Sequence, residues 1–399
     1  MPTIFKNYEG VQSKEIVRLI EKANKLTDGD GYKLYDDNAE SLERILDKIL
    51  TTAKKEKEWH IYFVTMYEMF YLLSRQDKSI KALKYAEIFY KDSELYMDTA
   101  VFNYPGTDIG YYSILSYSEI FTVYKKFPQI TDEKMEAFMR QYRGIIEKYG
   151  EDKNYYQDKL TLALLYKDIE AAKQAKEELW QSDIRSCYLC AMKPVLGYYL
   201  LCEDYESLEH MMFEIRAREI PAKHRWCYTH CYLAEDRKLI REVLGYCLMF
   251  GRSEYFHKLL EENSNLFKIK KDDTAEEFYL YACLRDWTNW CDAVKEMESD
   301  VEEWHKGQKT ALGYLYDCLC WYCYFTMLDK GGTHEVATEL AGKVKAAQEV
   351  ESGKCSGLEL AAYFEKEADK IGAEMEASRR KFDYKALKQS YEECISMTK

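Results

Sequence analysis

Apolar residues recur at intervals of three and four positions along almost the whole chain, which is the spacing of one buried face of an α-helix. In the segment 11–26 they stand at Val11, Ile16, Leu19, Ile20 and Ala23. Similar segments follow, and short polar turns separate them at 76–78, 203–204, 251–252 and 330–332. Five prolines and 18 glycines in 399 residues are fewer than a protein with many tight turns requires. The sequence therefore predicts an all-α protein of long helices and short connections.

The length of the chain favours a repeat array over a single compact core. Its 399 residues exceed the roughly 250–300 residues over which one core grows. Pairs of helical segments return at a spacing of about 34 to 40 residues, and such pairs bury their apolar faces only against neighbouring pairs. We expect N-terminal helices over 1–57, helical repeats over 58–267, and a C-terminal helical region over 268–399 that continues or caps the array.

Two segments carry the motif of a known helical repeat. In Leu196 to Leu208, a Leu-Gly pair and a large residue precede the turn Asp204-Tyr205, although Leu208 stands where the repeat has alanine. In Met66 to Phe89, Ala82 and Phe89 occupy the expected positions of the second helix, without the Leu-Gly pair. The chain thus resembles the tetratricopeptide-repeat (TPR-like) superfamily, over about 59–267. The resemblance implies an α-α superhelix, a solenoid of stacked antiparallel hairpins.

The same resemblance implies a function and a binding surface. TPR-like arrays bind an extended peptide or a partner helix in a concave groove, so we expect a non-enzymatic protein- or peptide-binding scaffold. The groove-facing positions of the repeat correspond to Tyr67, Tyr71 and Arg75 on one helix face and to Tyr198 in a later unit. Tyrosines suit this role because a ring with a hydroxyl group offers contact area at low conformational cost. Packing between adjacent hairpins is the alternative role for each of them.

The charge of the chain limits its partners. A formal net charge of −13 argues against nucleic acid, whose binding requires clustered lysine and arginine, and favours a basic protein or peptide. The most apolar run, 313–328, is interrupted by Asp317 and is shorter than a membrane span, so we expect no membrane partner. The first ten residues lack the apolar region of a signal peptide, and we expect a cytoplasmic protein. The oligomeric state stays open.

Cysteine and histidine provide the main alternative function. Cys187-x2-Cys190 and Cys227-x2-His230-Cys231 have the spacing of zinc ligand pairs. Both pairs fall within helical patterns and not in turns, so we expect packed thiols, no metal, no cofactor and no catalytic residues. A metal-dependent enzyme that uses these cysteines and His230 remains the alternative. A purely structural oligomer is the third interpretation.

Overall fold

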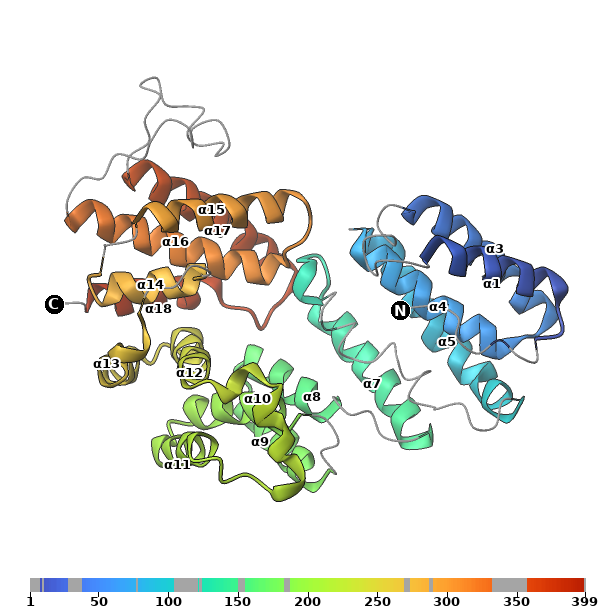
Figure 1. Cartoon of the computed structure of the whole chain (residues 1–399), viewed down its shortest axis with the longest axis horizontal. Helices are drawn as coiled ribbons and strands as arrows, with labels where there is room; N and C mark the ends of the chain where they lie inside the picture. Colours follow the sequence, from blue (N-terminus) through green and yellow to red (C-terminus); the bar gives the residue numbers. More distant parts are fainter. Residues whose placement is uncertain are drawn as a thin grey trace. The chain divides into compact units, whose positions relative to one another are not determined.

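The computed structural model of the chain (Figure 1) describes residues 8, 11–27, 38–76, 78–103, 121, 124–149, 155–182, 187–268, 273–286, 290–331 and 357–397. These residues form α-helices and short 3₁₀ helices, and no β-strand occurs among them. The predicted all-α class is confirmed. The chain divides into two compact units, 1–127 with 133–152, and 128–132 with 153–399. The predicted division between repeats and C-terminal region after residue 267 stays a prediction.

The described residues of the first unit form two helical hairpins and one further long helix. Its helices are α1 (Lys14–Thr27), α3 (Ala39–Glu56), α4 (Trp59–Arg75), α5 (Ser79–Asn103) and α7 (Asp132–Tyr149). Helix α1 packs on α3, α3 on α4, and α4 on α5. Phe138 of α7 contacts Tyr90 of α5, with ring centroids 5.6 Å apart. Helix α5 continues to Asn103, beyond which 104–120 lie outside the described residues.

The second unit begins with three hairpins. They are formed by α8 (Tyr155–Leu165), α9 (Ile169–Gln181), α10 (Tyr188–Leu201), α11 (Tyr205–Arg216), α12 (Asp236–Phe250) and α13 (Ser253–Glu262). The first helices of successive hairpins contact one another, α8 with α10 and α10 with α12. Between α11 and α12 the chain forms 3₁₀ helices η2 (Ala222–Thr229) and η3 (Tyr232–Ala234). A further 3₁₀ turn, η4 (Ser264–Leu266), follows α13.

Five more helices follow among the described residues of this unit: α14 (Ala275–Cys283), α15 (Trp290–His305), α16 (Ala311–Gly331), α17 (Gly357–Ser378) and α18 (Tyr384–Ser396). The last helix, α18, packs against α12, α13, α14, α16 and α17. Two hydrogen bonds to its backbone fix it: His257 Nε2 lies 2.6 Å from the Cys394 carbonyl, and the Tyr279 hydroxyl donates to the Tyr391 carbonyl at 3.0 Å. The C-terminal helix is therefore part of the core.

The Leu-Gly pair of the predicted repeat has a packing role in α10. A Cβ atom on Gly197 would lie 2.7 Å from the Tyr246 ring of α12 and 2.9 Å from Leu164 of α8. Real Cβ atoms do not approach so closely, because packed interiors leave no free volume. Gly197 thus allows α10 to fit between its two neighbours.

The turns between helices are short, as expected at 76–78, 203–204 and 251–252. Many helices end with a residue of left-handed backbone conformation, which is usually glycine. Here Gly251 fills that role after α12, whereas five other turns use exposed charged residues: Lys57, Lys167, Glu203, Arg218 and Arg285, with φ between 51° and 62°. This usage is one reason why the chain contains few glycines.

Two buried ion networks stabilise the second unit. Arg237 of α12 donates to Glu277 of α14 at 2.8 Å and to Asp273 at 2.6 Å. In the second network, Lys309 pairs with Asp300 of α15 and, at 2.6 Å, with Asp317 of α16. Both networks join different helices, so they fix how those helices pack.

Among the described helices, none combines the length with the apolar content that a membrane span requires. In particular, Asp317 of α16, which interrupts the most apolar run of the sequence, pairs with Lys309 within the folded unit.

Candidate functional site

The predicted tyrosines Tyr67 and Tyr71 lie one turn apart on α4. Every other side chain in the stretch 59–73 of this helix is buried, and these two are half-buried. Their rings stack at a centroid distance of 6.2 Å with 25° between the planes. Arg75 ends the same helix, but its side chain lies outside the described part of the structure. The partly exposed strip of α4 is therefore aromatic.

The fourth predicted residue, Tyr198, is half-buried on α10 and contacts a residue of the adjacent hairpin and a neighbour on its own helix. The Lys176 ammonium of α9 lies 4.5 Å from the centre of its ring, and the Tyr199 ring meets it edge-on at 5.7 Å. Burial, together with a hydrogen bond involving Cys202, raises the pKa of Tyr198 to about 12. Tyr198 belongs to the second unit and the α4 pair to the first, so the structure does not describe them as one site. Their roles in binding stay predictions.

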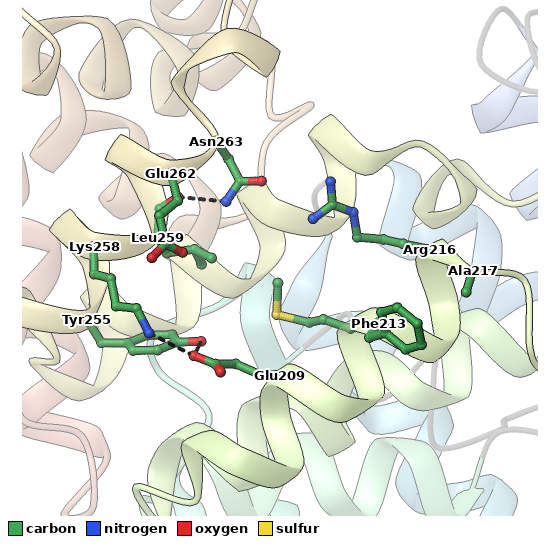
Figure 2. Close-up of a pocket in the computed structure, with 10 residues that line it drawn as sticks. Glu209, Phe213, Arg216, Ala217, Tyr255, Lys258, Leu259, Glu262 and Asn263 are labelled. Atoms are coloured by element: carbon green, nitrogen blue, oxygen red, sulfur yellow. Dashed lines mark hydrogen bonds and ion pairs between the residues drawn. The ribbon is translucent and has the colours of Figure 1, made fainter.

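A pocket of about 510 Å³ lies between the second helices of two successive hairpins, α11 and α13 (Figure 2). Met212 of α11 and Leu259 of α13 provide buried apolar contact surface in it. Phe213 lies at its edge with 61% of its surface exposed, which is high for a phenylalanine. The pocket thus offers an apolar surface with an aromatic side chain beside it.

Charged and polar side chains surround this apolar surface. The Glu209 carboxylate accepts from Lys258 at 3.0 Å and from the Tyr255 hydroxyl at 3.5 Å, so both donors are held in place. Burial and the Glu209 charge raise the pKa of Tyr255, so its hydroxyl stays protonated and able to donate. Arg216 pairs with Asp236 at 3.1 Å. Glu262 is exposed, and the described part of the chain gives it no ion pair.

The composition of the pocket favours binding over covalent chemistry. The ten residues that line it include no histidine, cysteine or serine, which are the usual nucleophiles and bases of acyl-transfer enzymes. Its lysine and its tyrosine are both bound to Glu209. The pocket therefore offers an apolar binding surface with polar groups at its rim.

Sequence reasoning missed Phe213, although a signal was present. The buried stripe of α11 consists of Leu208, Met211, Met212 and Ile215, which follow helical spacing. Phe213 falls off this stripe, and a large aromatic residue on the polar face of an amphipathic helix indicates an exposed apolar contact. The pocket itself was not predictable, because it depends on how α11 and α13 pack.

The local structure around the two cysteine pairs differs from the expectation. Cys187 caps the start of α10 and Cys190 lies in its first turn, while Cys227 and Cys231 belong to the 3₁₀ segment between α11 and α12. The expectation that both pairs stand within helices is therefore wrong for the second pair and only partly right for the first. The sulfur atoms of Cys187, Cys190 and Cys231 lie within 4.8 Å of one another.

His230 does not join these sulfurs in the way a mixed Cys/His site requires. Its ring is exposed, with Nδ1 2.6 Å from the Thr229 hydroxyl and 3.3 Å from the Trp226 carbonyl. It is not among the side chains whose ligand atoms come together in the described residues. His230 is therefore not placed with the cysteine sulfurs, and the Cys/His enzyme stays an alternative prediction.

No family model matches this chain, and neither a curated protein nor a solved structure matches it.

Proposed function

We propose that this chain is a non-enzymatic scaffold that binds a peptide segment of a partner protein. The observation that supports this proposal is the pocket between α11 and α13 with Phe213 at its edge. An exposed aromatic ring beside a hollow with an apolar floor is the arrangement in which a partner's anchor side chain buries most surface. We further propose that α8 to α13 form a TPR-like solenoid in the cytoplasm, supported by the successive contacts of α8, α10 and α12.

The chemistry of the pocket suggests what the peptide contains. One large apolar side chain would rest on Met212 and Leu259 and contact Phe213. Glu262, exposed at the rim, would pair with a lysine or arginine close to that anchor. The net charge of −13 also favours a basic partner, because opposite charges speed association. The proposed ligand is therefore a basic peptide with a large apolar residue.

A peptide-library selection on the folded full chain tests this function. Peptides displayed on phage would be selected, synthesised, and titrated against the wild type and against Phe213→Ser. We expect the selected peptides to contain an apolar residue next to a basic one. We also expect the variant to bind them at least about tenfold more weakly, because an anchor contact of this kind contributes about 1.4 kcal/mol or more. Enrichment of no peptide, or equal affinity for both proteins, would contradict the proposal.

The chain provides a matched control for that variant. Leu95 of α5 is exposed to the same extent as Phe213, 61%, and belongs to the other unit. Leu95→Ser therefore removes an equally exposed apolar side chain without changing the pocket. This variant should bind the peptides as the wild type does. A loss of affinity in both variants would indicate non-specific apolar binding.

The predicted groove residues are tested in the same titrations. The double change Tyr67→Ala and Tyr71→Ala removes the aromatic strip of α4. If the peptide extends over this surface, the double variant binds more weakly although it stays folded. If the α11/α13 pocket is the whole site, it binds as the wild type does.

A further inference from the structure

Four cysteines that are distant in sequence meet at the start of α10. We call Cys187, Cys190, Cys227 and Cys231 the thiol cluster. The Cys190 and Cys231 sulfurs are 3.5 Å apart, and Cys187 lies within 4.8 Å of both. Cys227, which is fully buried, is hydrogen-bonded to the Cys187 side chain. Three of the sulfurs therefore lie near one another, and Cys227 adjoins this group through Cys187.

The distances within the thiol cluster match a metal site better than a disulfide. A disulfide requires sulfurs about 2.05 Å apart. In a tetrahedral zinc site with Zn–S bonds of about 2.3 Å, neighbouring sulfurs are about 3.8 Å apart. The Cys190 and Cys231 sulfurs, 3.5 Å apart, are close to that value, and Cys187 lies within 4.8 Å of both, so small side-chain adjustments would bring these three sulfurs to it. The two pairs also have the short spacing, two and three intervening residues, of structural zinc sites.

The backbone around the thiol cluster is suited to thiolates. The Tyr188 amide donates to the Cys227 sulfur at 3.3 Å, and the Leu189 amide is hydrogen-bonded to the same sulfur. Both amides belong to the first turn of α10, whose N–H groups lack partners within the helix. Such N–H···S bonds orient a sulfur ligand and stabilise its negative charge.

The segment that supplies Cys227 and Cys231 buries few side chains. Polar contacts also hold it, because the Tyr228 hydroxyl donates to the Ile215 carbonyl at 2.7 Å and the Tyr232 hydroxyl donates to Glu242 at 2.7 Å. Between 217 and 235, which are all described, the buried side chains are Ile220, His224, Cys227 and Leu233. The 3₁₀ helix η2 is eight residues long, whereas isolated 3₁₀ runs rarely exceed three or four residues. An additional bond to α10 would explain how this conformation persists.

We propose that the thiol cluster binds one Zn²⁺ ion and that this ion fastens the η2–η3 segment to the start of α10. On binding, the four thiols release four protons to solvent and form four Zn–S bonds, without oxidation or reduction. Four sulfur ligands leave no open position for water or substrate, and His230 is held elsewhere by Thr229. The ion is therefore structural, and it would help to fix the pairing of α10 with the segment that leads into α12.

The first test is the metal content of the full chain. The wild type would be purified under reducing conditions, and its zinc measured by plasma mass spectrometry after dialysis against a weak chelator. We expect one zinc ion per chain, lost in Cys190→Ser and in Cys227→Ser. Cys202→Ser is the matched control, because Cys202 is also a partly buried cysteine at the other end of α10. This variant should retain the ion.

A second measurement uses only the wild type, so that a variant that fails to fold cannot mislead. Replacement of zinc by Co²⁺ should give the intense absorption of cobalt–thiolate bonds in tetrahedral geometry. Removal of the metal with a strong chelator should make amide hydrogen exchange about tenfold faster or more in 222–234, with α13 as the unchanged reference.

Several results would overturn the proposal. These are a wild-type chain that binds neither zinc nor cobalt, zinc retained in both Cys190→Ser and Cys227→Ser, and equal exchange with and without the metal. A metal-free chain that is lighter by two hydrogen atoms would also overturn it, and would assign a Cys190–Cys231 disulfide to the cluster instead.

Discussion

Arg237 is a charged side chain with 7% of its surface exposed, and it donates to four different partners. Besides Asp273 and Glu277, it bonds the Lys268 carbonyl at 2.7 Å and the Tyr281 hydroxyl at 2.8 Å. Replacing it by alanine removes the charge that pairs with two buried carboxylates, of which Glu277 keeps Arg241 at 3.5 Å, and breaking a buried pair costs about 3–5 kcal/mol. We expect Arg237→Ala to reduce the free energy of urea unfolding by that amount.

The neighbouring Lys238 is the control for this change. Lys238 pairs with Glu235 at the surface, one turn away, and such pairs contribute about 0.5 kcal/mol or less. Lys238→Ala should therefore unfold almost as the wild type does. If Arg237→Ala were equally mild, the network would not stabilise the fold.

Asp317 makes stability depend on pH. Burial, and then the neighbouring Asp300 carboxylate, raise the pKa of Asp317 to about 7, although Lys309 opposes the shift. The folded chain therefore keeps this proton up to about pH 7, whereas the unfolded chain releases it near pH 4. Because the folded state binds more protons than the unfolded state between about pH 4 and pH 7, the contribution of Asp317 to stability falls as the pH rises through this range.

Asp317→Asn removes this titration and leaves Lys309 paired with Asp300 alone. We expect the free energy of unfolding of the wild type, relative to the variant, to fall by about 1–2 kcal/mol between pH 5 and pH 8. Urea unfolding across this range measures it. Asp292→Asn, at an exposed partner of Lys295, should follow the wild-type profile. Parallel profiles for all three proteins would exclude a role for Asp317.

Single residues show where sequence reasoning reaches its limit. Asp317 is recognisable as a charge within an apolar run, but its partner Lys309 lies in the turn before α16, and no pattern in the sequence indicates that pairing. Phe213 could have been found from its position off the buried stripe. The two cysteine pairs were recognisable from their spacing, but their proximity was not, because it depends on how the segment after α11 folds back on α10.

At the scale of elements, two glycines in the same Leu-Gly-Tyr motif have opposite surroundings. Gly197 faces Tyr246 and Leu164 at less than 3 Å from a Cβ position, whereas nothing lies within 4 Å of such an atom on Gly245. Gly197→Ala should force α8, α10 and α12 apart and lower the free energy of unfolding by about 1–3 kcal/mol. Gly245→Ala should stabilise by about 0.5–1 kcal/mol, because alanine is the better helix former.

Thermal unfolding of both variants separates helix propensity from packing. A decrease in melting temperature for Gly197→Ala with an increase for Gly245→Ala is the expected result. Equal shifts would mean that α10 does not need the close approach.

The helices themselves were largely predictable, because apolar spacing and polar turns determine them locally. The turns at 203–204 and 251–252 are where the sequence places them, and Asp204 begins α11 by accepting from the Ser207 amide at 3.1 Å. The segment 222–234 was not predictable, since 3₁₀ helices lack the 3.6-residue spacing and are fixed by contacts outside themselves. Between 226 and 267 the structure has two α-helices, α12 and α13.

At the scale of the whole molecule, the second unit includes a short segment that is distant in sequence, 128–132. Arg379, with 2% exposure, donates to the Ile130 carbonyl at 3.3 Å, and the Lys381 amide donates to Asp132 at 3.1 Å. The Ser378 hydroxyl donates to the Pro128 carbonyl. Without this segment, Arg379 would lose a buried acceptor.

We therefore expect a fragment of residues 128–399 to be more stable than one of residues 153–399 by about 2–4 kcal/mol. Urea unfolding of the two fragments measures this difference. Equal stabilities would mean that the segment only lies on the unit without supporting it. The sequence could not predict this division into units, because the pairing of 128–132 with 378–381 joins positions about 250 residues apart.

The five charged residues of left-handed conformation have a practical consequence for anyone who wishes to engineer this protein. Each holds a backbone conformation that costs an L-residue about 1–2 kcal/mol. Glycine relieves this strain but loses more conformational entropy on folding, so the net gain is roughly half of that cost. Lys57 is exposed, and its left-handed backbone follows the end of α3, so Lys57→Gly should raise the melting temperature without changing the core. Combining such changes across the five turns would give a heat-resistant version of the molecule whose buried helix contacts are all unaltered.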